Sequence, residues 1–406
     1  MRLTHRLIVL GWITLIPAAV LLAQPLPAPP EDAPPVVAAP VEPKIEDVLA
    51  KLEKITGLAR KAPVASRKMN RDEIRAYVLE RLREEFDAED LDQEERIYRV
   101  LGLVPPQSDL RRTLVDMYTE QVGGFYDPKS KAYVIADWID AGLQEPVMAH
   151  ELVHALQDQY VPVEPVQERL RDNDDASRAY AALLEGSASL AMIAYMMNTP
   201  VEETTRLGDI SWLMQMAMQQ SQDQTPVFAA APQFLKESML FPYIRGSEFV
   251  RRLLETRKFN TLEQWLVSPP ATTEQILNPE KYLAVPPEPA LPVSWSVDEL
   301  LTLGRSDGRS RQGGQMLLQQ FLRTGLPKET AEAASAGWGG DSLQLLAAAE
   351  GQGGQVAWKI RWDTPAAAAR FAAAVGQWPA GPDKPAVQVS TPAPDLTILR
   401  IGRSLR

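Results

Sequence analysis

The sequence contains no cysteine and only three histidines among its 406 residues. The absence of cysteine excludes a disulfide framework, a thiolate nucleophile, a cysteine metal ligand and a lipid-modified cysteine near the N-terminus. Basic residues are fewer than acidic ones, with 42 Lys and Arg against 53 Asp and Glu, and the net charge is −11. Nucleic acids and anionic lipids bind mainly by pairing phosphate with Lys and Arg. The composition therefore argues against both as main partners.

The N-terminus has the layout of an export signal. Arg2 and Arg6 precede the apolar run LIVLGWITLIPAAVLLA, which ends at Ala23, and this order is typical of a secretory leader. We expect residues 1–23 to be a signal peptide. The alternative is an N-terminal membrane anchor, because the run is just long enough to span a bilayer and Leu21 is not the small residue preferred three positions before cleavage. The protein is predicted to be exported: periplasmic, secreted, or attached to a membrane through this segment alone.

The rest of the chain divides into a linker and two folded parts. Residues 24–44 are rich in Pro and Ala, which predicts an extended linker. Residues 45–305 are expected to form a mainly helical domain, because apolar residues recur at intervals of three and four. Within this domain, GGFYDPKSKAYVIAD has the turn residues Asp127 and Pro128 between two short apolar runs, which predicts a β-hairpin. Residues 306–406 show the order helix, strand, strand, helix, strand, strand, so the predicted fold class is α+β, mainly α, with a small C-terminal α+β unit.

Several helices of the first domain can be predicted individually. Helices are expected over residues 143–160, about 175–197 and 202–220, and another is expected to begin at FPYIRGSEFVRRLLE. Methionines recur at helical spacing in the second and third of these, which favours core packing over a ligand site. Thr272 and Gln275 are spaced as a helix-capping box.

The stretch AHELVHALQDQY places His150 and His154 one helical turn apart with Glu151 between them. Residues four apart share one face of a helix, so both imidazoles can reach one ion while Glu151 overlooks the open coordination position. Zinc lowers the pKa of water, and a glutamate can take the proton as the water attacks a carbonyl. A chance match is the alternative, but His5 lies in the predicted leader, so the folded part has both of its histidines in this motif. The spacing predicts a Zn²⁺ site with Glu151 as the catalytic base.

A third protein ligand is required, and without cysteine or further histidine it is expected to be a carboxylate. Glu185, in YAALLEGSASLAM, is the preferred candidate because it lies in an apolar helix, where an unpaired carboxylate is costly to bury. Gly186 and Ala188 would let that helix approach the metal helix closely. The alternatives lie in a charged stretch that we expect to be exposed, and they are Glu164, Glu168, Asp174 and Asp175.

Other side chains could support the chemistry. Asp158, one turn beyond His154, could accept the second ring N–H of that histidine, or it is an exposed helix residue. Tyr243 and Arg245, in FPYIRGSEF, could donate to the oxyanion that forms on attack, or they pack at the start of a helix. Of this pair, Tyr243 is included as a candidate catalytic residue.

The motifs VGGFYDP, HELVHALQDQ, LLEGSA, PYIRG and PPATTEQILNPEKY occur in this order between Met117 and Tyr282. Together they resemble a family of bacterial secreted zinc metallopeptidases of the gluzincin type, whose members commonly read GGFYDP, HELxHALQDQ, LxEGxA, PYxxG and PPxSTEQxLHPEKY. GWGGD and RWDTPAAAARF are similar to the C-terminal part of the family. The chain departs from the pattern at Asn278, where relatives usually have His, so a proton-transfer role is not expected there while a hydrogen-bonding role is.

The resemblance implies a zincin-like fold for the first domain and a metal held by His150, His154 and Glu185, with Glu151 as the catalytic residue. We therefore expect an exported zinc-dependent endopeptidase with a peptide or protein substrate, held by strand addition at a sheet edge near Tyr133. One alternative is a zincin-like scaffold or binding protein with a structural or vestigial zinc site. The intact Glu151 argues against it, because binding alone does not require this residue. A second alternative is hydrolysis of a non-peptide amide, such as a component of the cell wall.

Overall fold

The structure is a computed structural model, and it describes residues 13–15, 44–85, 88–208, 225–256, 262–304, 306, 308–347, 354–379, 381 and 384–402. The predicted linker, except for its last residue, lies outside the described residues. The same is true of the predicted leader except for residues 13–15, and of most of the helix predicted over residues 202–220.

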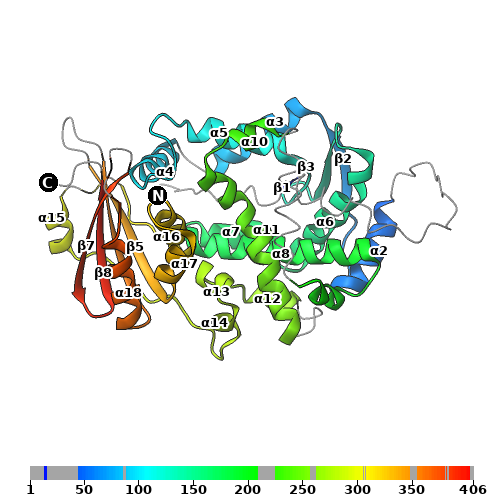
Figure 1. Cartoon of the computed structure of the whole chain (residues 1–406). Coiled ribbons are helices and arrows are strands. Elements are labelled where there is room, and N and C mark those ends of the chain that lie inside the picture. The colour runs from blue at the N-terminus through cyan, green and yellow to red at the C-terminus, as the bar shows by residue number, and fades with distance from the viewer. Residues whose placement is uncertain are drawn as a thin grey trace, which may run out of the picture.

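The protein is mainly helical and has two small sheets, which confirms the predicted α+β, mainly α class. Figure 1 shows one sheet at each end of the molecule and long helices between them. The N-terminal helices are α2 (Ile45–Thr56), α3 (Arg71–Glu85), α4 (Ala88–Val100) and α5 (Leu110–Gln121). The first of these ends where Gly57 adopts a positive φ of 73°, a conformation that glycine accepts without a steric penalty.

The first sheet has the strand order β1-β3-β4-β2. Its strands are β1 (Ile13–Leu15), β2 (Ala65–Met69), β3 (Val122–Asp127) and β4 (Ala132–Ala136). The antiparallel pair β3 and β4 is the predicted hairpin. β2 pairs with β4 in parallel and β1 pairs with β3 in antiparallel orientation. The predicted sheet edge near Tyr133 is therefore wrong, because β2 pairs with the strand that contains Tyr133; β2 itself is largely exposed and shows no alternating pattern that would reveal it.

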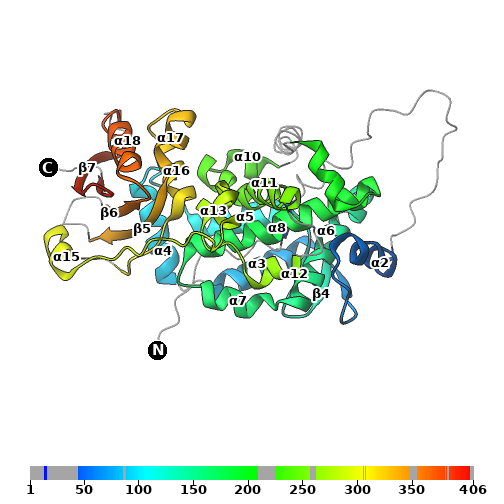
Figure 2. The ribbon, with the colours of Figure 1, turned by 90° about the horizontal axis from the view of Figure 1, so that it is seen from below.

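Three long helices fill the centre of the molecule: α6 (Ala141–Tyr160), α8 (Asp174–Met197) and α11 (Gln233–Thr256). Asp140 caps α6 by accepting from the N–H of Gly142, and Asn173 caps α8 by accepting from the N–H of Ala176. α8 packs between α6 and α11 (Figure 2). Among the described residues, α8 is the one helix long and apolar enough to cross a membrane, but 89% of its most apolar window is buried. It is thus the core helix of this domain.

The third central helix differs from its predicted extent. The sequence predicts that it begins at FPYIRGSEF, whereas α11 begins at Gln233 and contains Pro242 in its interior. The prediction failed because an interior proline removes one backbone hydrogen bond and usually ends a helix.

The helices α8 and α11 approach each other closely at two glycines. A Cβ on Gly186 would lie 2.1 Å from the carbonyl carbon of Gly246, and a Cβ on Gly246 would lie 2.1 Å from the carbonyl oxygen of Ala182.

Short helices connect these elements. They are α7 (Val163–Leu170), the 3-10 helix η1 (Val201–Leu207), α10 (Pro226–Ala230), α12 (Leu262–Val267), α13 (Thr273–Leu277), α14 (Pro279–Leu283) and α15 (Val297–Leu303). The side chain of Thr272 caps α13 by accepting from the N–H of Gln275. In place of the second, reciprocal hydrogen bond of a capping box, the Gln275 side chain accepts from the N–H of Ala271.

The C-terminal unit contains α16 (Gly314–Arg323), α17 (Lys328–Ser335), β5 (Trp338–Leu346), β6 (Gln355–Trp362), α18 (Pro365–Val375), β7 (Ala386–Ala393) and β8 (Leu396–Gly402). This is the predicted order of elements, and the strands form an antiparallel sheet in the order β5-β6-β8-β7. Trp358 packs on Phe321 of α16 and Trp362 packs on Phe371 of α18. Because alternate residues of a strand point to the same face, these helices cover one face of the sheet.

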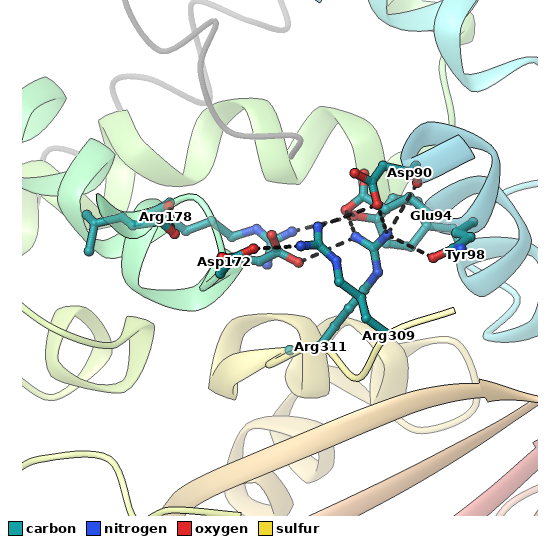
Figure 3. Close-up of polar contacts among 12 residues, drawn as sticks. Asp90, Glu94, Tyr98, Asp172, Arg178, Arg309 and Arg311 are labelled. Carbon is teal, nitrogen blue, oxygen red and sulfur yellow. Dashed lines mark hydrogen bonds and ion pairs between the residues drawn. The ribbon is translucent and has the colours of Figure 1, made fainter. Parts of the chain in front are cut away.

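The C-terminal unit contacts the first domain through buried charged groups. Figure 3 shows Arg309 and Arg311, which precede α16, beside acidic residues of α4 and of the segment that leads into α8. The Arg311 guanidinium is buried and lies 3.4 Å from an oxygen of Asp90 and 3.8 Å from one of Glu94. Arg309 lies 2.6 Å from Asp172. Buried charges are tolerated when they are paired, so the pairs of Arg311 fit a buried contact between the two parts, while the Arg309–Asp172 pair is partly exposed.

A second contact between the two parts surrounds Gly314. Asp341 of β5 accepts hydrogen bonds from the N–H groups of Gly313 and Gly314 and from Nε1 of Trp358. On the other side, a Cβ on Gly314 would lie 1.7 Å from Oδ1 of Asp175 in α8. The φ of Gly314 is 81°. A residue with a side chain therefore cannot replace this glycine between the two carboxylates.

Candidate metal centre

The three predicted ligands lie together between α6 and α8. The Nε2 atoms of His150 and His154 are 3.1 Å apart. Oε2 of Glu185 lies 3.0 Å from Nε2 of His150 and 3.4 Å from Nε2 of His154. All three side chains are buried, with Glu185 only 1% exposed. One ligand atom from each residue thus points toward a common centre.

The three separations fit a tetrahedral metal ion. With metal–ligand distances of about 2.0–2.1 Å, two corners of a tetrahedron lie about 3.3 Å apart. The observed separations of 3.0, 3.1 and 3.4 Å agree with this value. A buried carboxylate also requires a positive partner, and a divalent cation would supply it. The donor set of two imidazoles and one carboxylate is one that binds Zn²⁺ with a fourth position open.

The protonation of His150 and Glu185 suits a cation, whereas the pKa of His154, which burial alone would lower, is raised by the Glu185 carboxylate. Burial lowers the pKa of His150, although Glu185 partly opposes this, and the imidazole is favoured in its neutral form. Burial alone would raise the pKa of Glu185, but His154 and the hydrogen bond from Nε2 of His150 lower it below its ordinary value. Metal binding needs neutral imidazole and ionised carboxylate.

The four alternative carboxylates do not face the histidines. Glu164 and Glu168 lie on α7 with side chains 40% and 63% exposed. Asp174 and Asp175 are buried, contrary to the expectation of an exposed stretch. Asp174 lies 4.0 Å from Arg311, and Asp175 accepts hydrogen bonds from the Thr273 backbone and hydroxyl. These partners come from distant parts of the chain, so the local sequence could not reveal the burial.

Glu151 is buried on α6 beside the hairpin. The backbone N–H of Tyr126, in β3, donates to Oε2 of Glu151 over 2.7 Å. Burial raises the pKa of the Tyr133 phenol, in β4, well above its ordinary value. The nearby carboxylate of Glu151 raises it further. The hairpin therefore fixes the position of the Glu151 carboxylate, which lies on the same helix as the two histidines.

The second ring nitrogen of His154 has a partner that differs from the predicted one. Asp158 does not contact His154, and instead accepts from the Tyr126 hydroxyl over 2.8 Å and from the Lys131 ammonium over 2.7 Å. Oε1 of Gln157 lies 2.8 Å from Nδ1 of His154. The sequence predicts a carboxylate as this partner, whereas a neutral amide oxygen three residues along the helix reaches the same nitrogen.

Tyr243 reaches the site from α11, and Arg245 does not. The rings of Tyr243 and His150 are stacked with centroids 6.0 Å apart. Burial, then the carboxylates of Glu185 and Glu151, raise the pKa of Tyr243 well above its ordinary value, so the phenol stays protonated and can donate. Arg245 pairs with Glu248 over 2.7 Å and lines a separate cavity of about 490 Å³ between α11, α16 and α17.

Two other features lie outside this site. Nδ2 of Asn278 donates to Oε1 of Gln315 in α16, which joins the TTEQILNPEKY segment to the C-terminal unit. A second group of clustered carboxylates is Glu274, Glu288 and Asp363. The ammonium of Lys281 lies 3.0, 2.5 and 2.6 Å from their oxygens, respectively. The Lys281 ammonium compensates part of this negative charge, and burial raises the pKa of Glu274 to about 8, which favours its neutral form.

A family described as a domain of unknown function (DUF8575) matches residues 300–398, which extend from α15 into β8. No curated protein and no solved structure matches the chain. The matched region includes most of the C-terminal unit and excludes α6, α8 and α11, which carry the candidate metal centre.

Proposed function

We propose that the protein is an exported, zinc-dependent endopeptidase whose first domain, residues 45–305, is zincin-like and of the gluzincin type. The observation that carries the proposal is the convergence of His150, His154 and Glu185 at the spacing of tetrahedral ligands. Glu151 is buried on the same helix without being one of these ligands, and a scaffold protein would not need it.

The residues around the centre can divide the work of amide hydrolysis. Bound zinc would polarise the substrate carbonyl and activate water. Glu151 accepts a proton from the attacking water and delivers it to the amine that leaves when the C–N bond breaks. The N–H of Tyr126 keeps the Glu151 carboxylate in place. The protonated phenol of Tyr243 donates to the oxyanion that forms on the carbonyl oxygen.

The edge of β3 supports a peptide as substrate. β1 pairs antiparallel with this edge, with Ile13 opposite Phe125 and Thr14 opposite Gly124. An extended peptide in the place of β1 would be held by the same backbone groups. It would then lie next to Tyr126, whose N–H binds Glu151. A non-peptide amide would gain less from this edge, because it lacks a continuous peptide backbone.

The test combines metal analysis with digestion of a peptide library. Purified protein should hold about one zinc per chain, and His150→Ala or His154→Ala should lose it. Cleavage should stop on addition of a chelator and return with zinc. Glu151→Gln should keep the fold and the zinc but lose at least about a hundredfold in turnover, since an amide cannot accept the proton. Equal turnover by Glu151→Gln and the parent protein would remove Glu151 from the mechanism.

A further inference from the structure

We propose that Gln157 is a positioning residue that selects the metal-binding tautomer of His154 and ties that histidine to the helix that carries Glu185. The value of this arrangement for catalysis rests on the proposed function. The arrangement itself is a property of the metal-free protein, and it can be tested there.

The orientation of the Gln157 amide follows from its partners. The side chain is fully buried, and its Nε2 lies 3.2 Å from the carbonyl oxygen of Leu184 and 2.8 Å from Oγ of Ser187. A carbonyl oxygen can only accept, so the NH₂ end of the amide must face it. The Ser187 hydroxyl donates to the carbonyl oxygen of Leu183 over 2.7 Å, which leaves its oxygen free to accept. A flipped amide would place two oxygens against each other, so Oε1 of Gln157 must face His154.

This orientation decides the tautomer of His154. Oε1 of Gln157 is an acceptor without a hydrogen, and it lies 2.8 Å from Nδ1 of His154. A neutral imidazole has one donor and one acceptor nitrogen, so Nδ1 must carry the hydrogen. In the neutral ring Nε2 then carries the lone pair, and this atom lies 3.1 Å from Nε2 of His150 and 3.4 Å from Oε2 of Glu185. Gln157 therefore directs Nε2, and not Nδ1, toward the other two candidate ligands.

The two histidines differ in this respect. Nδ1 of His150 is buried and has no hydrogen-bond partner in the described part of the chain. Its other nitrogen, Nε2, lies 3.0 Å from Oε2 of Glu185, a carboxylate oxygen that can only accept, so the hydrogen of His150 is set by Glu185 and not by Gln157. His150 thus serves as an internal comparison in the same site, because a change at Gln157 should alter the tautomer of His154 and leave that of His150 unaffected.

Gln157 also connects the two helices that supply the ligands. The Gln157 side chain extends from α6. Its amide N–H groups donate to the carbonyl oxygen of Leu184 and to Oγ of Ser187, which flank Glu185 on α8. One side chain therefore orients an imidazole ligand and holds the helical turn that carries the carboxylate ligand. Removing the amide should weaken both.

The experiment is ¹⁵N NMR of histidine-labelled, metal-free protein at pH 8, where an ordinary imidazole is neutral. The parent protein should show His154 protonated at Nδ1. Gln157→Leu should shift it toward a mixture of tautomers and weaken zinc about 10–100-fold in a chelator competition. Gln157→Glu keeps an acceptor of similar shape, so it should retain the Nδ1-protonated form even if the leucine variant does not fold.

The matched control is Asp158→Asn, which changes the neighbouring buried side chain but not the partner of His154. It should leave the tautomer of His154 unchanged. The inference is overturned if the parent has His154 protonated at Nε2, or if Asp158→Asn alters the tautomer and Gln157→Leu does not. Absence of zinc binding or peptide cleavage in the parent would instead count against the proposed function, since the tautomer is measured without metal.

Discussion

Glu185 joins the two histidines of α6 to a second helix. Of the three candidate ligands, it is the one whose identity is hardest to predict from the sequence. Glu185→Ala should lower zinc affinity by at least about tenfold, because the site loses a ligand and its negative charge. Glu185→Gln should lower it nearly as much, since a neutral amide is a poor zinc ligand. A competitive chelator titration measures both.

Glu164→Gln and Glu168→Gln are the controls for Glu185. Both lie on α7 with partly or largely exposed side chains, and both should bind zinc as the parent does. If one of them weakened zinc binding while the Glu185 variants bound normally, the third ligand would belong to α7.

At the residue scale, the sequence was most informative where the signal is local. The spacing of His150 and His154 follows from helical geometry alone, and the structure brings both side chains to Glu185. The role of Gln157 was missed, because a neutral amide carries no charge signal and its other partners lie on α8. The two alternatives for Arg245 could not be separated from the sequence, because its surroundings depend on how α11 packs against the C-terminal unit.

At the scale of elements, the close contact of α8 and α11 sets the distance between Glu185 and Tyr243. Gly246→Ala would place a methyl group 2.1 Å from the carbonyl oxygen of Ala182. The helices would have to move apart, at a cost of about 1–3 kcal/mol in the free energy of unfolding. We expect a lower urea midpoint together with weaker zinc binding, because each helix carries a residue of the site.

Gly381→Ala is the control for this contact. Gly381 is exposed, and an added Cβ would approach its nearest neighbour, Lys384, only to 4.0 Å. Its stability and zinc binding should match those of the parent. Unchanged stability in Gly246→Ala would show that the two helices can repack around a methyl group.

The elements that could be predicted are those with a clear period. The helices predicted over residues 143–160 and 175–197 differ by at most two residues at each end from α6 and α8. β2 could not be recognised, because four of its five residues are exposed and its pairing comes from the distant β4. α11 begins earlier than predicted because its packing against α8 outweighs the effect of Pro242.

At the scale of the whole molecule, the contact around Gly314 should respond to pH. Burial raises the pKa of Asp341 from 3.8 to about 7, against the hydrogen bond from Trp358. The folded protein then binds this proton more tightly than the unfolded chain does. The contribution of Asp341 to the free energy of unfolding is therefore greatest below about pH 4, is lost as pH rises toward 7, and is constant above that.

Asp341→Asn removes this titration, because an amide stays neutral. As pH is raised from 5 to 8, the parent should lose stability relative to Asp341→Asn, and the difference should level off near the upper end. Urea midpoints at four pH values measure it. Parallel curves for the two proteins would contradict the raised pKa.

The position of β1 predicts an effect of N-terminal processing. Export should leave a mature chain that begins near Gln24 or Pro25, and this chain lacks the strand that covers the edge of β3. We expect a higher kcat/KM on peptides for the mature chain than for the full-length protein, because β1 no longer competes for that edge. N-terminal sequencing of exported protein decides the first step. An intact Met1 in the membrane fraction would favour the anchor.

The order of the two folded parts could be predicted from composition and period, but their contact could not. Asp90, Asp174 and Arg311 are far apart in the sequence, and each alone resembles an ordinary surface charge. Their pairing depends on how the C-terminal unit packs against α4 and α8. Patterns within one segment do not contain such information.

The buried Arg311, which precedes α16, also bears on folding cooperativity. If the C-terminal unit detached while the first domain stayed folded, Asp90, Glu94 and Asp174 would lose Arg311, a guanidinium that pairs with all three. Such a half-folded species is costly, because it loses the ion pairs of a guanidinium that is buried in the contact between the two parts. The two parts should therefore melt in a single transition, with the calorimetric and van 't Hoff enthalpies equal. One free energy of unfolding then describes both folded parts, including the α8 helix and the C-terminal unit that packs beside it.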